Sequence, residues 1–146
     1  MIAQTIQLAL APVFVLVAMG NFLNVMSSRL SRVVDRSREL QGRHVATNGP
    51  EHDMIVAEMR LIDRRMSLVT RAIRLLVIAG LFIGATVTVL FVEELVGASL
   101  QTVAAGFFLI AVGLLMWALV LFLRETQVAA AQLRIPRDYL ELHREL

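Results

Sequence analysis

Three long stretches of the chain carry no charged side chain. Residues 1–28 are uncharged, with an apolar core from about Ile6 to Met26, and residues 75–92 and 100–123 are uncharged as well. A helix needs about 20 mostly apolar residues to cross the hydrocarbon core of a bilayer. The pattern therefore predicts three transmembrane helices, over about 6–28, 75–92 and 100–123, with the short second span extending past Leu75 into residues whose arginines reach the interface.

Residues 29–74 keep helical periodicity outside these spans. Apolar residues recur near one face after the first span, at Leu30, Val33, Val34 and Leu40, and a stripe of near-heptad spacing leads into the second span, at Ile55, Ile62, Met66, Val69, Ile73 and Leu76. The breakers in "QGRHVATNGP" (41–50) predict a turn between them. We expect spans one and two to continue as an antiparallel helical hairpin over 29–74, its stripe packed on the first helix or on another subunit.

The last part of the chain, residues 124–146, continues the third span. We expect its helix to run to about Arg134 and to be interrupted at Pro136. The segment after Pro136, "RDYLELHREL", is predicted to pack on the hairpin or to lie on the membrane. The predicted fold is therefore an all-α integral membrane protein, one domain over residues 1–146.

Arginine positions predict the orientation. All 14 basic residues are arginine, and ten of them lie in residues 29–74 against six acids. The loop "EELVGAS" (93–99) holds two glutamates and no arginine, and the remaining four arginines follow the third span. Because cytoplasmic loops carry an excess of basic residues, we expect the hairpin and the tail to be cytoplasmic and the N-terminus to face outward. The first stretch lacks a basic leader region, so we expect it to remain as a span rather than to be cleaved.

Composition narrows the function classes. Hydrophobic residues make up 58% of the chain, charged residues 18%, and the mean hydropathy is +0.72, as in membrane proteins. There is no cysteine, no GxSxG and no glycine-rich phosphate loop, so we predict neither an enzyme nor a cofactor. His44, His52 and Asp53 flank the turn without metal-ligand spacing, and His143 stands alone in the tail, so no metal site is predicted.

One face of the first span carries the strongest functional pattern. At spacings of three and four residues, this face, which we term the span-one face, comprises Gln7, Leu10, Phe14, Val17, Asn21, Asn24 and Ser28. Two amides left without partners in lipid cost several kcal/mol. A pore lining would give them water, with Leu10, Phe14 and Val17 as a hydrophobic gate. The more ordinary interpretation, which we favour for the amides, is hydrogen bonding to another helix.

Other features of the spans admit two interpretations each. Pro12 permits a gating hinge or, more simply, a static bend. Gly80 and Gly84 form a GxxxG motif extended by Thr88, which predicts close helix packing, either with Gly106 or Gly113 of the same chain or with another subunit.

The charged residues at the membrane boundaries have simple explanations. Glu93 and Glu94 form a solvated turn or, in an oligomer, a carboxylate ring that attracts cations. Five arginines near the membrane are expected to contact lipid head groups: Arg29, Arg32, Arg71, Arg74 and Arg124. Nucleic acid is not an expected partner, because acids interleave with the arginines and aromatics are few.

Several segments resemble one family of bacterial membrane proteins. They are "APVFVLVAMGNFLNVMSSRLSRVVDR", the arginine-rich segment ending "RRMSLVTRAIRLL", and "RETQVAAAQLRI" after the last span. Together they resemble the uncharacterised family catalogued as domain of unknown function number 2721, over most of the chain. The resemblance implies a small bacterial integral membrane protein with three spans and carries no activity, cofactor or catalytic residue. We expect the protein in the inner membrane.

Two functions remain open at this point. The first is a homo-oligomeric ion-conducting pore lined by the span-one face, because three spans are too few to enclose a water path alone. The second is a structural or accessory subunit whose cytoplasmic hairpin docks a soluble partner, through Ile55, Ile62 and Met66 or through its arginines. Membrane lipids are expected partners in either case.

Overall fold

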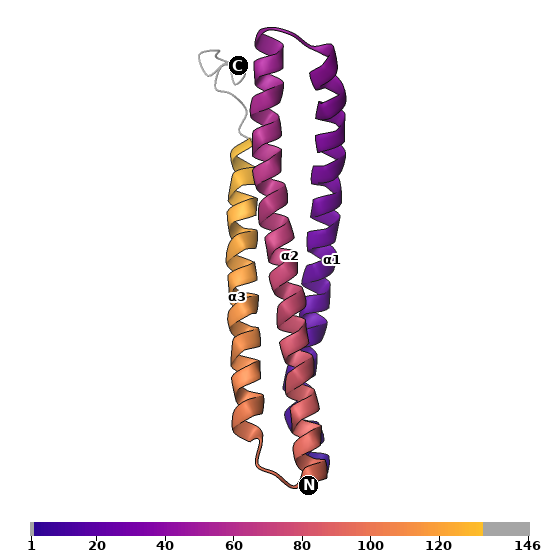
Figure 1. Ribbon diagram of the computed structural model, residues 1–146, viewed down its shortest axis with the longest axis vertical. Coiled ribbons are helices and arrows are strands. Elements are labelled where there is room, and N and C mark those ends of the chain that lie inside the picture. Colours follow the sequence, from indigo (N-terminus) through magenta and orange to yellow (C-terminus); the bar gives the residue numbers. More distant parts are fainter. Residues whose placement is uncertain (1, 133–146) are drawn as a thin grey trace, which may run out of the picture.

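The computed structural model describes residues 2–132 and is entirely helical over that range (Figure 1). Its helices are α1 (Ile2–Ala46), α2 (Pro50–Val96) and α3 (Gln101–Gln132). The all-α prediction is confirmed. The expected break at Pro136, the helix after it and His143 lie outside the described residues.

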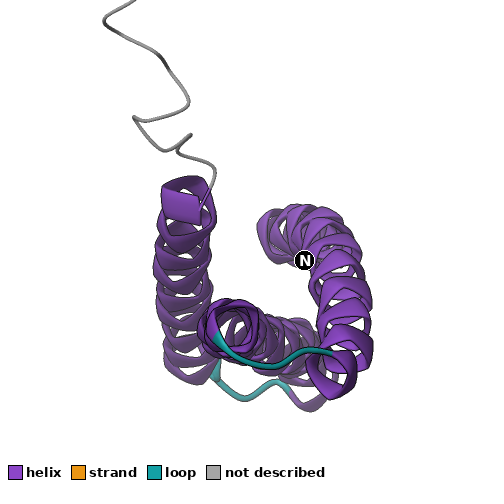
Figure 2. Ribbon diagram, turned by 90° about the horizontal axis from the view of Figure 1, so that it is seen from above, coloured by secondary structure: helices purple, strands orange, loops and turns teal. Residues whose placement is uncertain are grey.

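The helix α2 lies between the other two. Both α1 and α3 pack along it in antiparallel fashion and make few contacts with each other, so the three helices form an open arc when seen from one end (Figure 2). All three are long and apolar enough to span a membrane, yet only 17% to 22% of the residues in their most apolar stretches are buried inside the protein. Most of this apolar surface therefore needs lipid or another chain as its surroundings.

A seven-residue period governs the contact between α1 and α2. The buried residues of this period on α1 are Thr5, Pro12, Met19, Met26, Val33 and Leu40, and those on α2 are Ile55, Ile62, Val69, Leu76 and Ile83. Such a repeat keeps the apolar seam of two supercoiled helices in contact over a long distance. The predicted stripe is thus present, and at the hairpin tip Ile55 and Ile62 form one cluster with Val33 and Leu40. Its partner is α1 of the same chain.

The turn between α1 and α2 is shorter than predicted. Instead of a break over 41–50, α1 continues through Gly42 to Ala46, and three residues lead to Pro50 at the start of α2. An interior glycine costs a helix only about 1 kcal/mol relative to alanine. Burial of Leu40, which is fully covered, and the ion pair between Arg43 and Glu51 at 3.5 Å hold this last turn against α2.

The sharp reversal itself occurs at Gly49, whose φ of 75° lies in the left-handed region that glycine adopts without strain. On the same hairpin, the Arg36 guanidinium bridges Glu58 of α2 at 2.7 Å and Glu39 at 2.8 Å. Its hydrogen bonds with Glu58 and then Glu39 raise the pKa of Arg36 above its ordinary value.

Small residues dominate where α3 packs on α2. The buried residues of α3 include Ala104, Ala111 and Ala118, again seven apart, and Ala111 and Ala118 join the central cluster with Ala72 and Ala79 of α2. Small side chains let helices approach closely and gain dispersion energy. Alanines, rather than the predicted glycines, provide this approach.

The GxxxG motif of α2 does not meet α3. A Cβ added at Gly80 would lie 3.7 Å from Leu16 and 3.8 Å from Met19, so Gly80 faces α1. A Cβ at Gly84, Gly106 or Gly113 would meet nothing within 4 Å. Gly84 and Thr88 lie on the exposed surface, and the expected contact with Gly106 or Gly113 within the chain is wrong.

Candidate functional site

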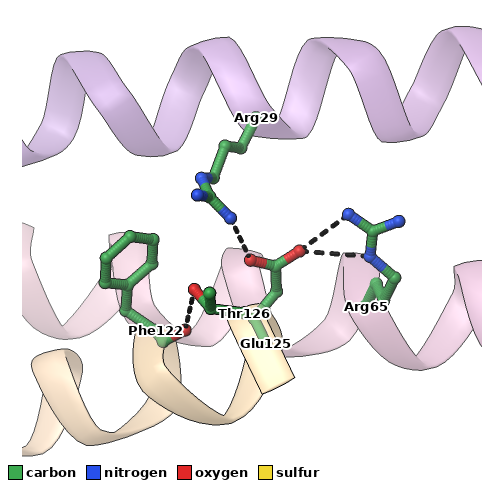
Figure 3. A network of polar contacts seen from close by, with 5 residues as sticks. All are labelled: Arg29, Arg65, Phe122, Glu125 and Thr126. Atoms are coloured by element: carbon green, nitrogen blue, oxygen red, sulfur yellow. Dashed lines mark hydrogen bonds and ion pairs between the residues drawn. The ribbon is translucent and has the colours of Figure 1, made fainter. Parts of the chain in front are cut away.

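One buried carboxylate connects all three helices. Glu125 of α3 is 0% exposed and lies between two guanidinium groups (Figure 3). Its Oε2 accepts a hydrogen bond from Arg29 Nη1 of α1 at 2.9 Å. Its Oε1 accepts from Arg65 of α2, through Nε at 3.1 Å and Nη2 at 2.9 Å. We call Arg29, Arg65 and Glu125 the three-helix ion cluster.

The heptad period explains why Glu125 is buried. It lies seven residues after Ala118 and continues the series of α3 residues that face α2. Glu125 comes two residues after the last apolar residue of the third span, Leu123, and Arg29 is the first charged residue after the first uncharged stretch. The cluster therefore lies at one boundary of the apolar zone, where α1 and α3 otherwise make few contacts.

The cluster has further support around it. The Arg29 guanidinium carbon lies 4.8 Å from the centre of the Phe122 ring, within the range of a cation–π interaction. Arg29 and Arg65 side chains keep 34% and 22% of their surface exposed, whereas Glu125 keeps none. A carboxylate without water depends on its charged partners, so removal of either arginine is expected to weaken the attachment of α3.

The role of Glu125 was not predicted from the sequence. Arg29, expected to contact lipid head groups, forms an ion pair with Glu125. The other four arginines of that prediction, Arg32, Arg71, Arg74 and Arg124, are exposed. The signal that was present in the sequence is the seven-residue spacing of Ala104, Ala111 and Ala118, which predicts a buried position at residue 125.

The span-one face lies on the outside of the chain. All seven of its residues are exposed, with Phe14 at 68% and Val17 at 61%. At 3.6 residues per turn, Asn21 and Asn24 point away from Met19 and Met26, the residues that α1 packs on α2. Within residues 2–132 neither amide makes a side-chain hydrogen bond. We favoured hydrogen bonding of these amides to another helix, and no described helix of the same chain provides such a bond.

The pairing of α1 with α2 sets the depth of these amides. Gly80 lies against Met19, and farther along Arg65 shares Glu125 with Arg29. Between these two points, Arg71 and Arg74 on α2 reach about the level of Asn24 and Asn21 on α1. Both arginines are exposed. The two asparagines thus lie at about the level of two exposed arginine residues of the neighbouring helix, near one end of the apolar zone.

The opposite end holds a small polar pocket. Glu94 Oε2 accepts a hydrogen bond from the Thr5 hydroxyl of α1 at 3.0 Å. Glu93 lies half-buried beside it, and its Oε2 is covered without a hydrogen-bond partner among the described residues. The pocket has a volume of about 170 Å³ and is lined by Gln4, Thr5, Leu8, Leu90, Glu93, Glu94 and Gln101. Both glutamates therefore lie beside α1. The predicted solvated turn does not describe Glu93, whose Oε2 is covered, whereas Glu94 is exposed.

Pro12 is buried in the α1–α2 seam, and α1 stays helical through it. An adjoining apolar cavity of about 280 Å³ is lined by Leu8, Ala11, Pro12, Thr86, Leu90, Gln101, Ala104, Ala105 and Phe108. A bend or a hinge at Pro12 would therefore have room beside it.

The histidines of the turn pack against each other with tilted rings. The ring centres of His44 and His52 are 4.3 Å apart, and His52 Nδ1 lies 3.2 Å from the Thr47 carbonyl oxygen. Over residues 2–132 no group of three histidine, cysteine or acidic side chains could hold a metal ion. These histidines close the hairpin tip.

Comparison with known proteins identifies the family of the chain. The model of the family described as "Protein of unknown function (DUF2721)" matches residues 9–135, and the chain belongs to this family. No curated protein and no solved structure matches the chain.

Proposed function

We propose that this member of the DUF2721 family is a non-enzymatic subunit of a homo-oligomeric membrane pore, with the span-one face turned toward the axis. The observation that carries the proposal is the exposure of that whole face on the side of α1 away from α2. Its amides at Asn21 and Asn24 find no partner in the described part of their own chain, and water or another copy would supply one.

The distribution of polarity along this face suits a narrow conduction path. Gln7 and Ser28 stand near its two ends, and Asn21 and Asn24 share their depth with Arg71 and Arg74. Between Gln7 and Asn21, an apolar collar is formed by Leu10, Phe14 and Val17. Such constrictions gate pores by excluding water. The amides would then line a polar mouth at one end of the path.

The open arc of helices requires several copies. A single chain leaves α1 covered on one side only and encloses no path between its helices (Figure 2). The arginine distribution favours the cytoplasmic side for the hairpin and an outward N-terminus, in the inner membrane of a bacterium. In this orientation Glu93 and Glu94 belong to the outer end and the three-helix ion cluster to the inner end.

A second function, docking of a soluble protein on the hairpin, keeps one favourable observation. Ile55 and Ile62, first expected to form that contact, are buried against α1 and are not available. However, Met54 and Leu61 are exposed beside Arg43 and Glu51, around a groove of about 610 Å³ at the hairpin tip. Crosslinking in cells from this groove would yield a reproducible heterologous partner if docking is the function, and only self-crosslinks if it is not.

The test of the pore is ion flux through liposomes that contain the purified protein. We expect flux that Asn21→Leu and Asn24→Leu change by at least severalfold, because leucine extends the apolar collar and removes the polar mouth. Ser27→Leu is the control, since Ser27 is exposed on the same helix, about one turn past Asn24 toward Arg29, and about a quarter turn from the span-one face.

Two results would contradict the pore. The first is absence of flux under every ion gradient and pH tested. The second is a strictly monomeric mass for the protein in detergent and in bilayers, because one chain has no enclosed path. Flux that responds equally to Ser27→Leu would assign the effect to the helix as a whole rather than to its proposed lining.

A further inference from the structure

A groove with two arginines lies between α2 and α3, near the three-helix ion cluster. It has a volume of about 440 Å³ and is lined by Arg64, Leu68, Arg124, Gln127 and Val128. The two guanidinium groups come from different helices, and the lining contains no acidic residue. The groove therefore offers positive charge beside two apolar side chains and one amide.

The two arginines have no charged partner in the described part of the chain. Neither Arg64 nor Arg124 makes an ion pair or a hydrogen bond there, and both are exposed. Their neighbours Arg65 and Glu125 are engaged with each other. An anion in the groove would thus meet two guanidinium groups that no described residue neutralises, and guanidinium groups hold phosphate oxygens by charge-assisted hydrogen bonds.

The depth of the groove indicates the source of that anion. Arg124 directly follows Leu123, the last residue of the third apolar stretch, and Leu123 is 57% exposed. Farther into the span, α3 exposes Val120, Trp117 and Met116. Trp117 precedes Arg124 by seven residues, two helical turns on the same face. An acyl chain can lie along this exposed apolar surface while its head group reaches the arginines.

We propose that the groove between α2 and α3 binds the phosphate of an anionic glycerophospholipid, with Arg64 and Arg124 as its ligands and the acyl chain along α3 toward Trp117. The site is separate from the span-one face and does not depend on the pore. Arg124, which we expected to contact lipid head groups, would then bind the phosphate together with Arg64 of α2.

The single tryptophan of the chain reports on this site. Purified protein in mixed micelles is titrated with phosphatidylglycerol brominated on its acyl chains, which quenches nearby tryptophan, and separately with equally brominated phosphatidylcholine. We expect anionic lipid to quench Trp117 at lower mole fraction than neutral lipid. Arg64→Gln and Arg124→Gln should each reduce that preference about fivefold. The neutral-lipid titration of each variant shows whether its Trp117 surface remains intact.

Arg32→Gln is the matched control. Arg32 is exposed on α1 and lies outside the groove. It comes three residues after Arg29, which shares Glu125 with Arg65, so it lies near the level of Arg64. We expect it to leave the preference unchanged. Equal quenching by the two lipids, or an equal loss in Arg32→Gln, would overturn the site. Displacement of the brominated anionic lipid by an equimolar amount of inorganic phosphate would overturn the lipid as the ligand and assign a soluble phosphate instead.

Discussion

Replacement of Glu125 by glutamine tests the three-helix ion cluster directly. Glutamine keeps the shape of the side chain and one carbonyl oxygen, but it removes the charge that Arg29 and Arg65 share at 2.9 Å. Removal of one partner from a buried ion pair costs about 3 to 5 kcal/mol. Because the two arginine side chains are 34% and 22% exposed and can gain some hydration, we expect the lower end, about 3 kcal/mol.

The assay is reversible unfolding in mixed micelles by titration with sodium dodecyl sulfate, followed by circular dichroism. Glu58→Gln serves as the control, since Glu58 also pairs with an arginine, Arg36, but with 37% and 41% exposure of the two side chains. Exposed pairs contribute about 0 to 1 kcal/mol. If Glu125→Gln destabilises the protein no more than Glu58→Gln does, the cluster does not hold α3 on the other helices.

Two further substitutions test the packing of the helices. Leu40→Ala removes a fully buried side chain at the hairpin tip and should lower the free energy of unfolding by about 2 to 5 kcal/mol. Nearby backbone amides should then exchange hydrogen faster. Val45→Ala, at an 88% exposed side chain, should change neither quantity. Ala111→Leu overfills the α2–α3 contact and should cost about 1 to 3 kcal/mol in the same unfolding assay, whereas Ala105→Leu, at an exposed position, should not. Equal effects of each substitution and its control would refute the packing described here.

Most of the fold could be predicted from the spacing of apolar residues in the sequence. The stripe from Ile55 to Leu76 predicted a long helix and a need for a partner, and α1 of the same chain meets that need. The residue at which α1 ends was harder to predict. Gly42, where the helix continues, is a helix breaker in the sequence just as the residues of the turn after it are. Only tertiary contacts, the burial of Leu40 and the pair of Arg43 with Glu51, keep the helix intact through Gly42.

The candidate sites depended on facts that a linear pattern does not contain. Whether Asn21 and Asn24 are covered depends on which of the three helices lies in the middle. The structure places α2 in the middle, against the side of α1 opposite to these asparagines. Glu125 looked like one charge among several after the third span. Its burial becomes predictable only when the alanines of α3 are recognised as a seven-residue series that meets α2.

The most direct test of the proposed assembly is disulfide formation between copies of α1. The chain has no cysteine, so Asn24→Cys introduces a single thiol, on the exposed face that we place at the axis. We predict that mild oxidation in membranes yields covalent dimers of Asn24→Cys and none of Thr102→Cys, an exposed position on α3. Monomers alone from Asn24→Cys, with dimers from Thr102→Cys, would contradict an assembly in which α1 faces α1.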